Sequence, residues 1–278
     1  MSMERISKAL ELAARQRESR IERPRAPPPP NAAPAVEQGD AEDQTRTATF
    51  RAPLVSFDAM TLEREHVLAP SAAGPNGSAY KLLRTQVLKR LDQLQANTLA
   101  MLSPKAAAGK TLTAINLAIA IAAEHGRTAL LVDLDLRNPT VHTRLGFEPA
   151  LGVEECLMGD RPVGDAIVRV AGYDRLALLP ARNAVEHSSE LLTCERATRL
   201  VAELRARYAN RIILFDLPPV LQADDALAFS RTVQAGLMVV GEGRTQRDDL
   251  ARSMELLRDL TLVGTLLNGS RERSVPAY

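Results

Sequence analysis

Short apolar runs alternate with amphipathic stretches along most of the chain. The apolar runs predict six strands, at residues 97–102, 128–132, 176–179, 211–215, 237–240 and 262–267. Residues 110–124, 189 to about 208 and about 246–260 have the apolar spacing of helices. Continuous apolar strands separated by helices are typical of a parallel sheet covered on both faces. The pattern therefore predicts a doubly wound α/β domain with a mostly parallel sheet over residues 78–270.

The chain before this domain has a different pattern. Residues 1–22 predict an amphipathic helix, since Ile6, Leu10 and Ala13 recur among charged residues. One possibility is that this helix docks on a partner or on the main domain. The alternative is a frayed helix that stays in solvent. Prolines and then a polar stretch follow, so residues 23–77 predict a disordered linker, with a proline-rich ligand for a small recognition domain as the alternative. We expect residues 271–278 to form a flexible tail.

Composition excludes several classes of function. A formal net charge of +1 and 3% aromatic residues, with no Trp, argue against a nucleic-acid partner. The two cysteines, Cys156 and Cys194, are too few for a disulfide framework. The chain start lacks a signal-peptide core, and no apolar stretch is long enough to span a bilayer. We therefore expect a cytoplasmic protein with no transmembrane segment of its own, recruited to the inner face of the membrane only by a partner.

The first predicted strand runs into a loop with phosphate-binding chemistry. A strand, a tight turn and a helix N-terminus present backbone N–H groups and a positive helix end to phosphate oxygens. Gly109 allows close backbone approach, Lys110 reaches the outer phosphates, and the Thr111 hydroxyl ligates magnesium. The predicted nucleotide-binding residues are Lys105, Ala106, Ala107, Ala108, Gly109, Lys110, Thr111 and Leu112. A helix start without a ligand is the alternative.

The loop departs from the usual glycine-rich pattern. Pro104 stands where the first glycine is usual, and Ala106, Ala107 and Ala108 fill the positions between. Alanine in the left-handed region costs about 1 kcal/mol. We therefore expect the three alanines to keep ordinary backbone conformations, or the loop to bind nucleotide less well.

Three aspartates follow predicted strands. Asp133 and Asp135 are two apart after the second strand and point the same way, and Asp216 ends the strand before Pro218. Ligands sit beyond the carboxyl ends of parallel strands, and carboxylates that converge there suit a magnesium ion. For Asp135, a salt bridge to Arg137 is the alternative.

Asn268 follows the last predicted strand. It either reads the adenine edge of a bound nucleotide or forms a turn with Gly269.

The motifs together resemble the bacterial tyrosine kinases of capsular and exopolysaccharide synthesis, relatives of the septum-site and chromosome-partition ATPases. The resemblance covers residues 78–270. It rests on the ordered set Ala79-Tyr80-Lys81-Leu82-Leu83-Arg84-Thr85, Ser103-Pro104 with Gly109-Lys110-Thr111, Val132-Asp133-Leu134-Asp135-Leu136-Arg137, Ser189-Glu190-Leu191-Leu192, Phe215-Asp216-Leu217-Pro218-Pro219-Val220 and Leu266-Leu267-Asn268. It implies a P-loop nucleotide-binding fold of the deviant Walker A type, as in the free-standing cytoplasmic autokinases.

The resemblance also implies an activity, phosphoryl transfer from ATP to tyrosine with Mg²⁺. The implied catalytic residues are Lys110, Asp133, Asp135 and Asp216, and the implied magnesium-side residues are Thr111, Asp133 and Asp216. The implied partner is a membrane-embedded polysaccharide chain-length protein, or co-polymerase, that activates the kinase. A homo-oligomer is a further implication.

Three positions depart from the family pattern. The C-terminal tyrosine cluster is reduced to Tyr278. The Glu-x-x-Arg-x-x-Arg oligomerisation helix reads Ser78-Ala79-Tyr80-Lys81-Leu82-Leu83-Arg84. Lys105 falls where the partition ATPases place a lysine that reaches across a dimer, with a solvated loop residue as the alternative. These departures keep open an ATP-controlled dimerisation switch without kinase activity, and a scaffold that binds no ATP.

Overall fold

The computed structural model describes residues 52–69, 75–159, 161–207 and 210–270. The predicted helix at residues 1–22, the proline-rich part of the predicted linker and the tail with Tyr278 lie outside these residues. Within the described part, no helix combines the length and the hydropathy that crossing a bilayer requires.

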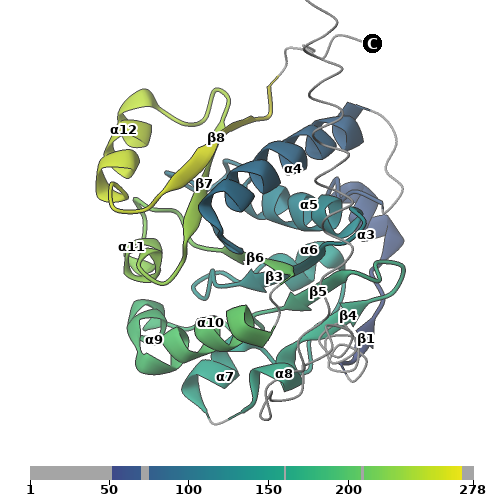
Figure 1. The fold of residues 1–278 in the computed structure, drawn as a ribbon. Helices are drawn as coiled ribbons and strands as arrows, with labels where there is room; N and C mark the ends of the chain where they lie inside the picture. Colours follow the sequence, from purple (N-terminus) through teal and green to yellow (C-terminus); the bar gives the residue numbers. More distant parts are fainter. Residues whose placement is uncertain (1–51, 70–74, 160, 208–209, 271–278) are drawn as a thin grey trace, which may run out of the picture. The chain divides into compact units, whose positions relative to one another are not determined.

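One eight-stranded sheet forms the centre of the domain, in the order β1-β4-β5-β3-β6-β2-β7-β8 (Figure 1). The strands are β1 (Leu54–Val55), β2 (Thr98–Leu102), β3 (Thr128–Asp133), β4 (Val168–Val170), β5 (Leu176–Leu179), β6 (Arg211–Asp216), β7 (Ala235–Gly241) and β8 (Leu262–Asn268). All neighbouring strands run parallel except β4 and β5, which are antiparallel. The predicted doubly wound, mostly parallel α/β fold is confirmed.

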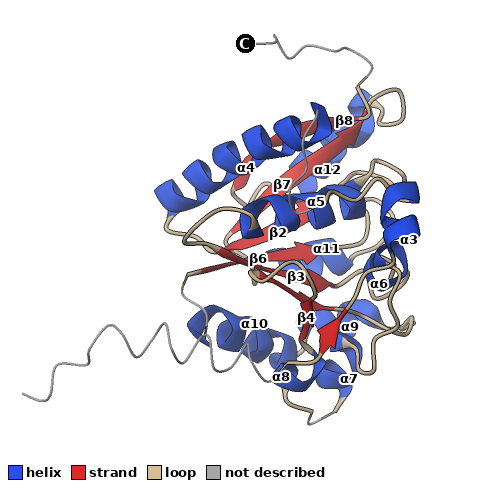
Figure 2. Ribbon diagram, turned by 90° about the vertical axis from the view of Figure 1, so that its right-hand side faces the viewer, coloured by secondary structure: helices blue, strands red, loops and turns tan. Residues whose placement is uncertain are grey.

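Helices cover both faces of this sheet (Figure 2). They are α3 (Ala59–Arg64), α4 (Pro75–Leu94), α5 (Lys110–Ala122), α6 (Val141–Leu145), α7 (Val153–Met158), α8 (Val163–Ala166), α9 (Ser188–Thr193), α10 (Glu195–Arg207), α11 (Asp225–Ser230) and α12 (Arg247–Leu256). Residues of α4, α5 and α6 pack into one apolar cluster, and residues of α7 to α11 pack into another.

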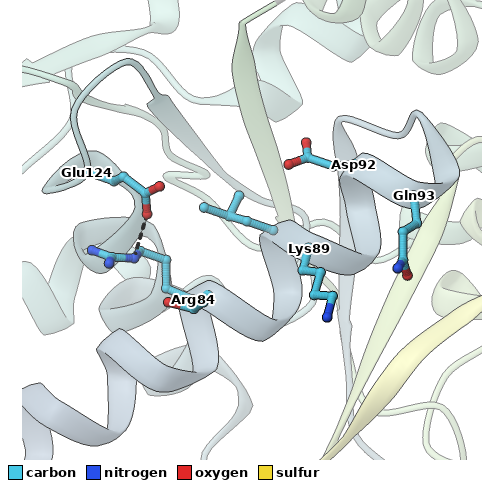
Figure 3. A pocket seen from close by; sticks show the side chains of 7 residues that line it. Arg84, Lys89, Asp92, Gln93 and Glu124 are labelled. Carbon is cyan, nitrogen blue, oxygen red and sulfur yellow. Dashed lines mark ion pairs between the residues drawn. The ribbon is translucent and has the colours of Figure 1, made fainter. Parts of the chain in front are cut away.

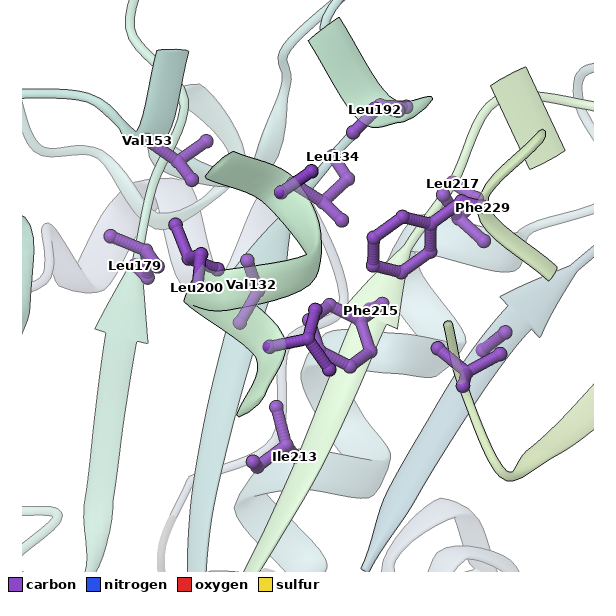
Figure 4. Packing of buried hydrophobic residues seen from close by; sticks show 14 of the residues in the cluster. Val132, Leu134, Val153, Leu179, Leu192, Leu200, Ile213, Phe215, Leu217 and Phe229 are labelled. Atoms are coloured by element: carbon purple, nitrogen blue, oxygen red, sulfur yellow. The ribbon is translucent and has the colours of Figure 1, made fainter. Parts of the chain in front are cut away.

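The alternation of side chains along each strand divides the core between these clusters. In β2, Leu99 and Met101 belong to the cluster under α5, whereas Leu102 belongs to the cluster on the opposite face. Phe215 of β6 lies at the centre of that second cluster, with its ring 5.0 Å from the ring of Phe229 in α11 (Figure 4). Because both faces are buried, the strands have continuous apolar sequences.

All six predicted strands are present, but sequence reasoning missed β1 and β4. These strands have two and three residues, too few to show a period. Residues 54–69 fall within the predicted linker, and instead form β1 and α3. The backbone N–H of Leu68 donates to the Asn116 amide oxygen at 2.8 Å, and the Tyr173 hydroxyl donates to the Leu68 carbonyl at 3.1 Å. These partly buried hydrogen bonds hold the segment on the domain.

Candidate nucleotide site

The residues predicted to bind nucleotide gather at the carboxyl edge of the central strands. β2 lies between β6 and β7, so the loop from Ser103 to Gly109 leaves the sheet beside the ends of both. Asp133 at the end of β3 is the register partner of Asp216 at the end of β6. The parallel sheet thereby brings together segments that lie far apart in the sequence, such as those of Lys110 and Asp216, which are 106 residues apart.

The loop has two residues in the left-handed region. Gly109, just before α5, has a φ of 85°, and a side chain there would put its Cβ 1.9 Å from the Asn268 amide nitrogen. Glycine is therefore required for both conformation and space. Ala107 has a φ of 62°, unlike either alanine beside it. The first of the two alternatives, that all three alanines keep ordinary backbone conformations, is therefore wrong for Ala107, whose carbonyl accepts a hydrogen bond from a distant residue. The second alternative, weaker nucleotide binding, stays a prediction.

Three segments support the loop from outside. After β6, the N–H groups of Val220 and Leu221 donate to the carbonyls of Ser103 and Pro104, at 2.9 and 3.1 Å. After β7, the Arg244 guanidinium donates to the Ala107 carbonyl at 3.0 Å. At the end of β8, the Asn268 amide donates to the Ala108 carbonyl at 2.9 Å.

Asn268 thus contacts the phosphate loop, and neither alternative proposed for it describes this contact. Arg244 was missed altogether, since a single arginine after a glycine-rich turn belongs to no motif.

Lys110 lies at the centre of the acidic cluster. Its amino group is 2.5 Å from one Asp216 oxygen and 3.9 Å from an Asp135 oxygen. The Thr111 hydroxyl donates to the other Asp216 oxygen at 2.7 Å. Lys110 is only 6% exposed, and Asp216 is fully buried, so this ion pair is shielded from solvent.

Asp133 is held by backbone groups. The N–H groups of Asp135 and Val141 donate to its two oxygens, at 3.2 and 3.1 Å. Burial, and then repulsion from Asp216, raises the pKa of Asp133 well above the ordinary value of an aspartate.

Asp135 is the most exposed of the three aspartates. Burial raises its pKa to about 6, although the nearby Lys110 acts to lower it. The alternative salt bridge between Asp135 and Arg137 is not formed. The Arg137 guanidinium instead lies 2.9 Å from the buried Asp225 carboxylate, which also accepts the Ser188 hydroxyl.

The donor set fits a nucleotide with magnesium. One lysine faces three aspartates, two of which have raised pKa values, so a bound cation would relieve their repulsion. Among the described residues, no group of three or more His, Cys, Asp or Glu side chains could hold a metal ion alone. Magnesium would therefore be bound by phosphate oxygens together with Thr111 and the aspartates, as is usual for this ion in proteins.

Two predicted binding residues have other surroundings. The Lys105 amino group is 2.7 Å from an Asp249 oxygen at the start of α12, within the same chain. Leu112, in the first turn of α5, packs partly buried against the apolar cluster of that face.

A pocket of about 600 Å³ lies elsewhere, along α4 and the end of α5 (Figure 3). Its lining includes Arg84, the one arginine kept from the predicted oligomerisation helix, and none of the nucleotide-site residues. Arg84 is ion-paired with Glu124 at 2.7 Å and donates to the Ala120 carbonyl. Arg84 therefore has partners within its own chain.

The chain is similar to known sequences over much of the described domain. The AAA domain family matches residues 96–235. Tyrosine-protein kinase YwqD of Bacillus subtilis is 27% identical over 212 residues, which cover 76% of this chain and 88% of YwqD. Tyrosine-protein kinase wzc of Salmonella typhi is 33% identical over 163 residues, which cover 58% of this chain and 22% of wzc. This chain therefore spans most of one curated relative and less than a quarter of the other.

Solved structures give the same relationship. The kinase domain of the Escherichia coli tyrosine kinase ETK superposes with a TM-score of 0.64 and 26% identity, over 73% of this chain and 78% of that domain. The septum site-determining protein MinD of Pyrococcus horikoshii, complexed with Mg-ADP, has a TM-score of 0.53 and 26% identity, over 65% of this chain and 74% of MinD. This chain belongs to the AAA domain family, and its resemblance to the bacterial tyrosine-protein kinases is confirmed.

Proposed function

We propose that this chain is an ATP-dependent protein tyrosine kinase that regulates capsular or exopolysaccharide biosynthesis and export. The observation that carries the proposal is the convergence of Lys110 and three aspartates beside a phosphate loop. Relatives named as tyrosine-protein kinases support the same reaction.

Lys110 and the loop amides would bind the ATP phosphates. The Lys110 amino group, now 2.5 Å from Asp216, would turn to the transferring phosphoryl group and stabilise its charge. Thr111, Asp133 and Asp216 would hold magnesium, which neutralises phosphate charge when bound. The protein contributes positioning and charge neutralisation, the main requirements of phosphoryl transfer.

Asp135 would accept the proton of the tyrosine hydroxyl. Its pKa of about 6 leaves it ionised at neutral pH, yet more basic than an ordinary aspartate. A new bond would form between the tyrosine oxygen and the γ-phosphorus, while the bond to the ADP oxygen breaks. Asp135 is more exposed than Asp133 or Asp216, so it is the aspartate that an incoming side chain reaches.

The acceptor we propose is Tyr278, in a neighbouring copy of the chain. Tyr173 is excluded as an acceptor, because it is buried and its hydroxyl donates to the Leu68 carbonyl. The activating partner is a membrane-embedded chain-length protein, which would recruit this cytoplasmic kinase to the inner face of the membrane.

A phosphotyrosine assay with purified protein, Mg²⁺ and ATP tests the proposal. We expect a signal in the wild type and in Lys89→Met, a control on α4, and none in Lys110→Met. Loss of the signal in Tyr278→Phe would identify the acceptor. A wild type that stays blank, even with a candidate membrane partner, would contradict the kinase proposal.

A nucleotide-controlled dimerisation switch is the second candidate, favoured by the likeness to MinD. In that case Lys105 would have to leave Asp249 and reach across a dimer. Lys105→Ala would then abolish ATP-dependent dimers, whereas Asp249→Ala would preserve or strengthen them. If Lys105 serves only the ion pair within its own chain, neither variant should change the oligomeric state.

A further inference from the structure

The phosphate loop is tied to the β7–β8 side of the sheet at three of its residues. The Lys105 side chain forms an ion pair with Asp249. The Ala107 carbonyl accepts a hydrogen bond from Arg244, and the Ala108 carbonyl accepts one from Asn268. We call Arg244, Asp249 and Asn268 the loop brace. All three come from residues 244–268, a part of the chain that supplies none of the three aspartates near Lys110.

Two of these contacts determine where backbone N–H groups point. In a planar trans peptide, the carbonyl of one residue and the N–H of the next point in opposite directions. When Arg244 and Asn268 hold the carbonyls of Ala107 and Ala108, the N–H groups of Ala108 and Gly109 must point away from the brace. Within the described residues neither N–H donates a hydrogen bond, so both are available to phosphate oxygens.

The brace also acts on an unfavourable conformation. Ala107 has a φ of 62°, a region that a residue with a Cβ disfavours by roughly five- to thirtyfold. Without Arg244, relaxation of Ala107 would turn its carbonyl and with it the N–H of Ala108. Gly241 lets the end of β7 lie close to the phosphate loop, since a Cβ at this position would lie only 3.2 Å from the Ala108 Cα.

We propose that Arg244 and Asn268 are positioning residues for nucleotide binding, which hold the phosphate loop in its binding conformation despite the left-handed Ala107. This inference rests on the proposed ATP binding. It assigns Asn268 a function in holding the loop in place of reading the adenine edge.

A double-mutant cycle between Arg244 and Ala107 tests the mechanism, with Mg-ATP affinity of the full chain measured by calorimetry. Arg244→Ala should weaken binding about tenfold, because the loop then samples relaxed conformations. In the background of Ala107→Gly, which adopts positive φ without strain, the same change should cost less than about threefold. Equal losses in both backgrounds would overturn the proposal.

Arg247→Ala is the matched control, since it removes the same charge three residues away. Arg247 is exposed and, within the described part of the chain, makes no hydrogen bond or ion pair with the phosphate loop. Its loss should leave affinity within about twofold, the range of a distant surface charge. A tenfold loss in Arg247→Ala as well would mean that Arg244 acts only through long-range charge, against the proposal.

Inorganic tripolyphosphate with Mg²⁺ tests the function of Asn268. If Asn268 positions the loop, Asn268→Ala should lower the affinities for ATP and for tripolyphosphate by the same factor. A loss confined to ATP would show adenine recognition and contradict the positioning function.

Hydrogen exchange separates a failed brace from a failed proposed function. In nucleotide-free protein, the backbone amides of residues 103–112 should exchange faster in Arg244→Ala than in the wild type. In Arg244→Lys, which keeps a donor, their exchange rate should lie between those of the wild type and Arg244→Ala. Unchanged exchange would overturn the brace. If the amides exchange faster in Arg244→Ala but the wild type does not bind Mg-ATP, the proposed nucleotide binding is refuted. The proposal that Arg244 holds the loop is then still supported.

Discussion

Asp135→Asn should make the nucleotide-free protein more stable while it removes the proposed proton acceptor. Burial raises the Asp135 pKa from 3.8 to about 6, so the folded protein holds this carboxyl's proton more tightly than the unfolded chain does. Above pH 6 the carboxylate must be ionised in a site that resists ionisation. A rise of this size corresponds to about 3 kcal/mol lost from the free energy of unfolding at pH 7.5.

The sign of the pH dependence follows from the raised pKa. Between about pH 4 and pH 6 the native state binds more of this proton than the unfolded state, so this carboxyl's contribution to stability falls as pH rises. Asparagine resembles the protonated aspartate and lacks this dependence. The advantage of Asp135→Asn should therefore shrink by about 1.4 kcal/mol when the pH is lowered from 7.5 to 5.

Urea unfolding without nucleotide or Mg²⁺ at both pH values measures the difference, and Asp92→Asn on α4 is the control. Asp92 is an exposed aspartate paired with Arg127, so its variant should gain no stability at either pH. The reasoning is refuted if Asp135→Asn is less stable than the wild type at pH 7.5, or if its advantage does not change with pH.

Two further predictions concern the loop and the magnesium side. Gly109→Ala should lower the free energy of unfolding by about 2 kcal/mol or more and abolish ATP binding, because it combines positive φ with a clash against Asn268. The control is Gly264→Ala, whose new Cβ has no atom within 4 Å. This control should be close to neutral in the same urea titration. Thr111→Val should raise the Mg²⁺ concentration needed for ATP binding on the order of tenfold and leave metal-free ATP binding unchanged, as followed by calorimetry at fixed ATP; an unaltered Mg²⁺ requirement would exclude the hydroxyl as a ligand.

The sequence predicted every strand of four or more residues, but the 20-residue helix α4 was not among the helices that it predicted. Each six-residue strand such as β3 or β6 ends at an aspartate, and the parallel arrangement brings Asp133 and Asp216 into register. The convergence of these aspartates with Lys110 could therefore be predicted before any coordinates. The short strand β1 could not, because its two residues pair with β4 only through tertiary packing.

The loop brace was beyond sequence reasoning for a related reason. Arg244 contacts Ala107 across 137 residues, and Asn268 contacts Ala108 across 160 residues. Neither contact leaves a local pattern. The left-handed Ala107 was unexpected for the same reason, since propensity disfavours it and only distant partners stabilise it.

The fate of the γ-phosphate tests the central claim most directly. Purified protein, with a candidate membrane partner where one is needed, would be incubated with Mg²⁺ and γ-labelled ATP, and the label on tyrosine compared with the label released as inorganic phosphate. A tyrosine kinase predicts label on tyrosine that disappears in Lys110→Met. Label released only as inorganic phosphate, with none on protein, would contradict the account and leave an ATPase.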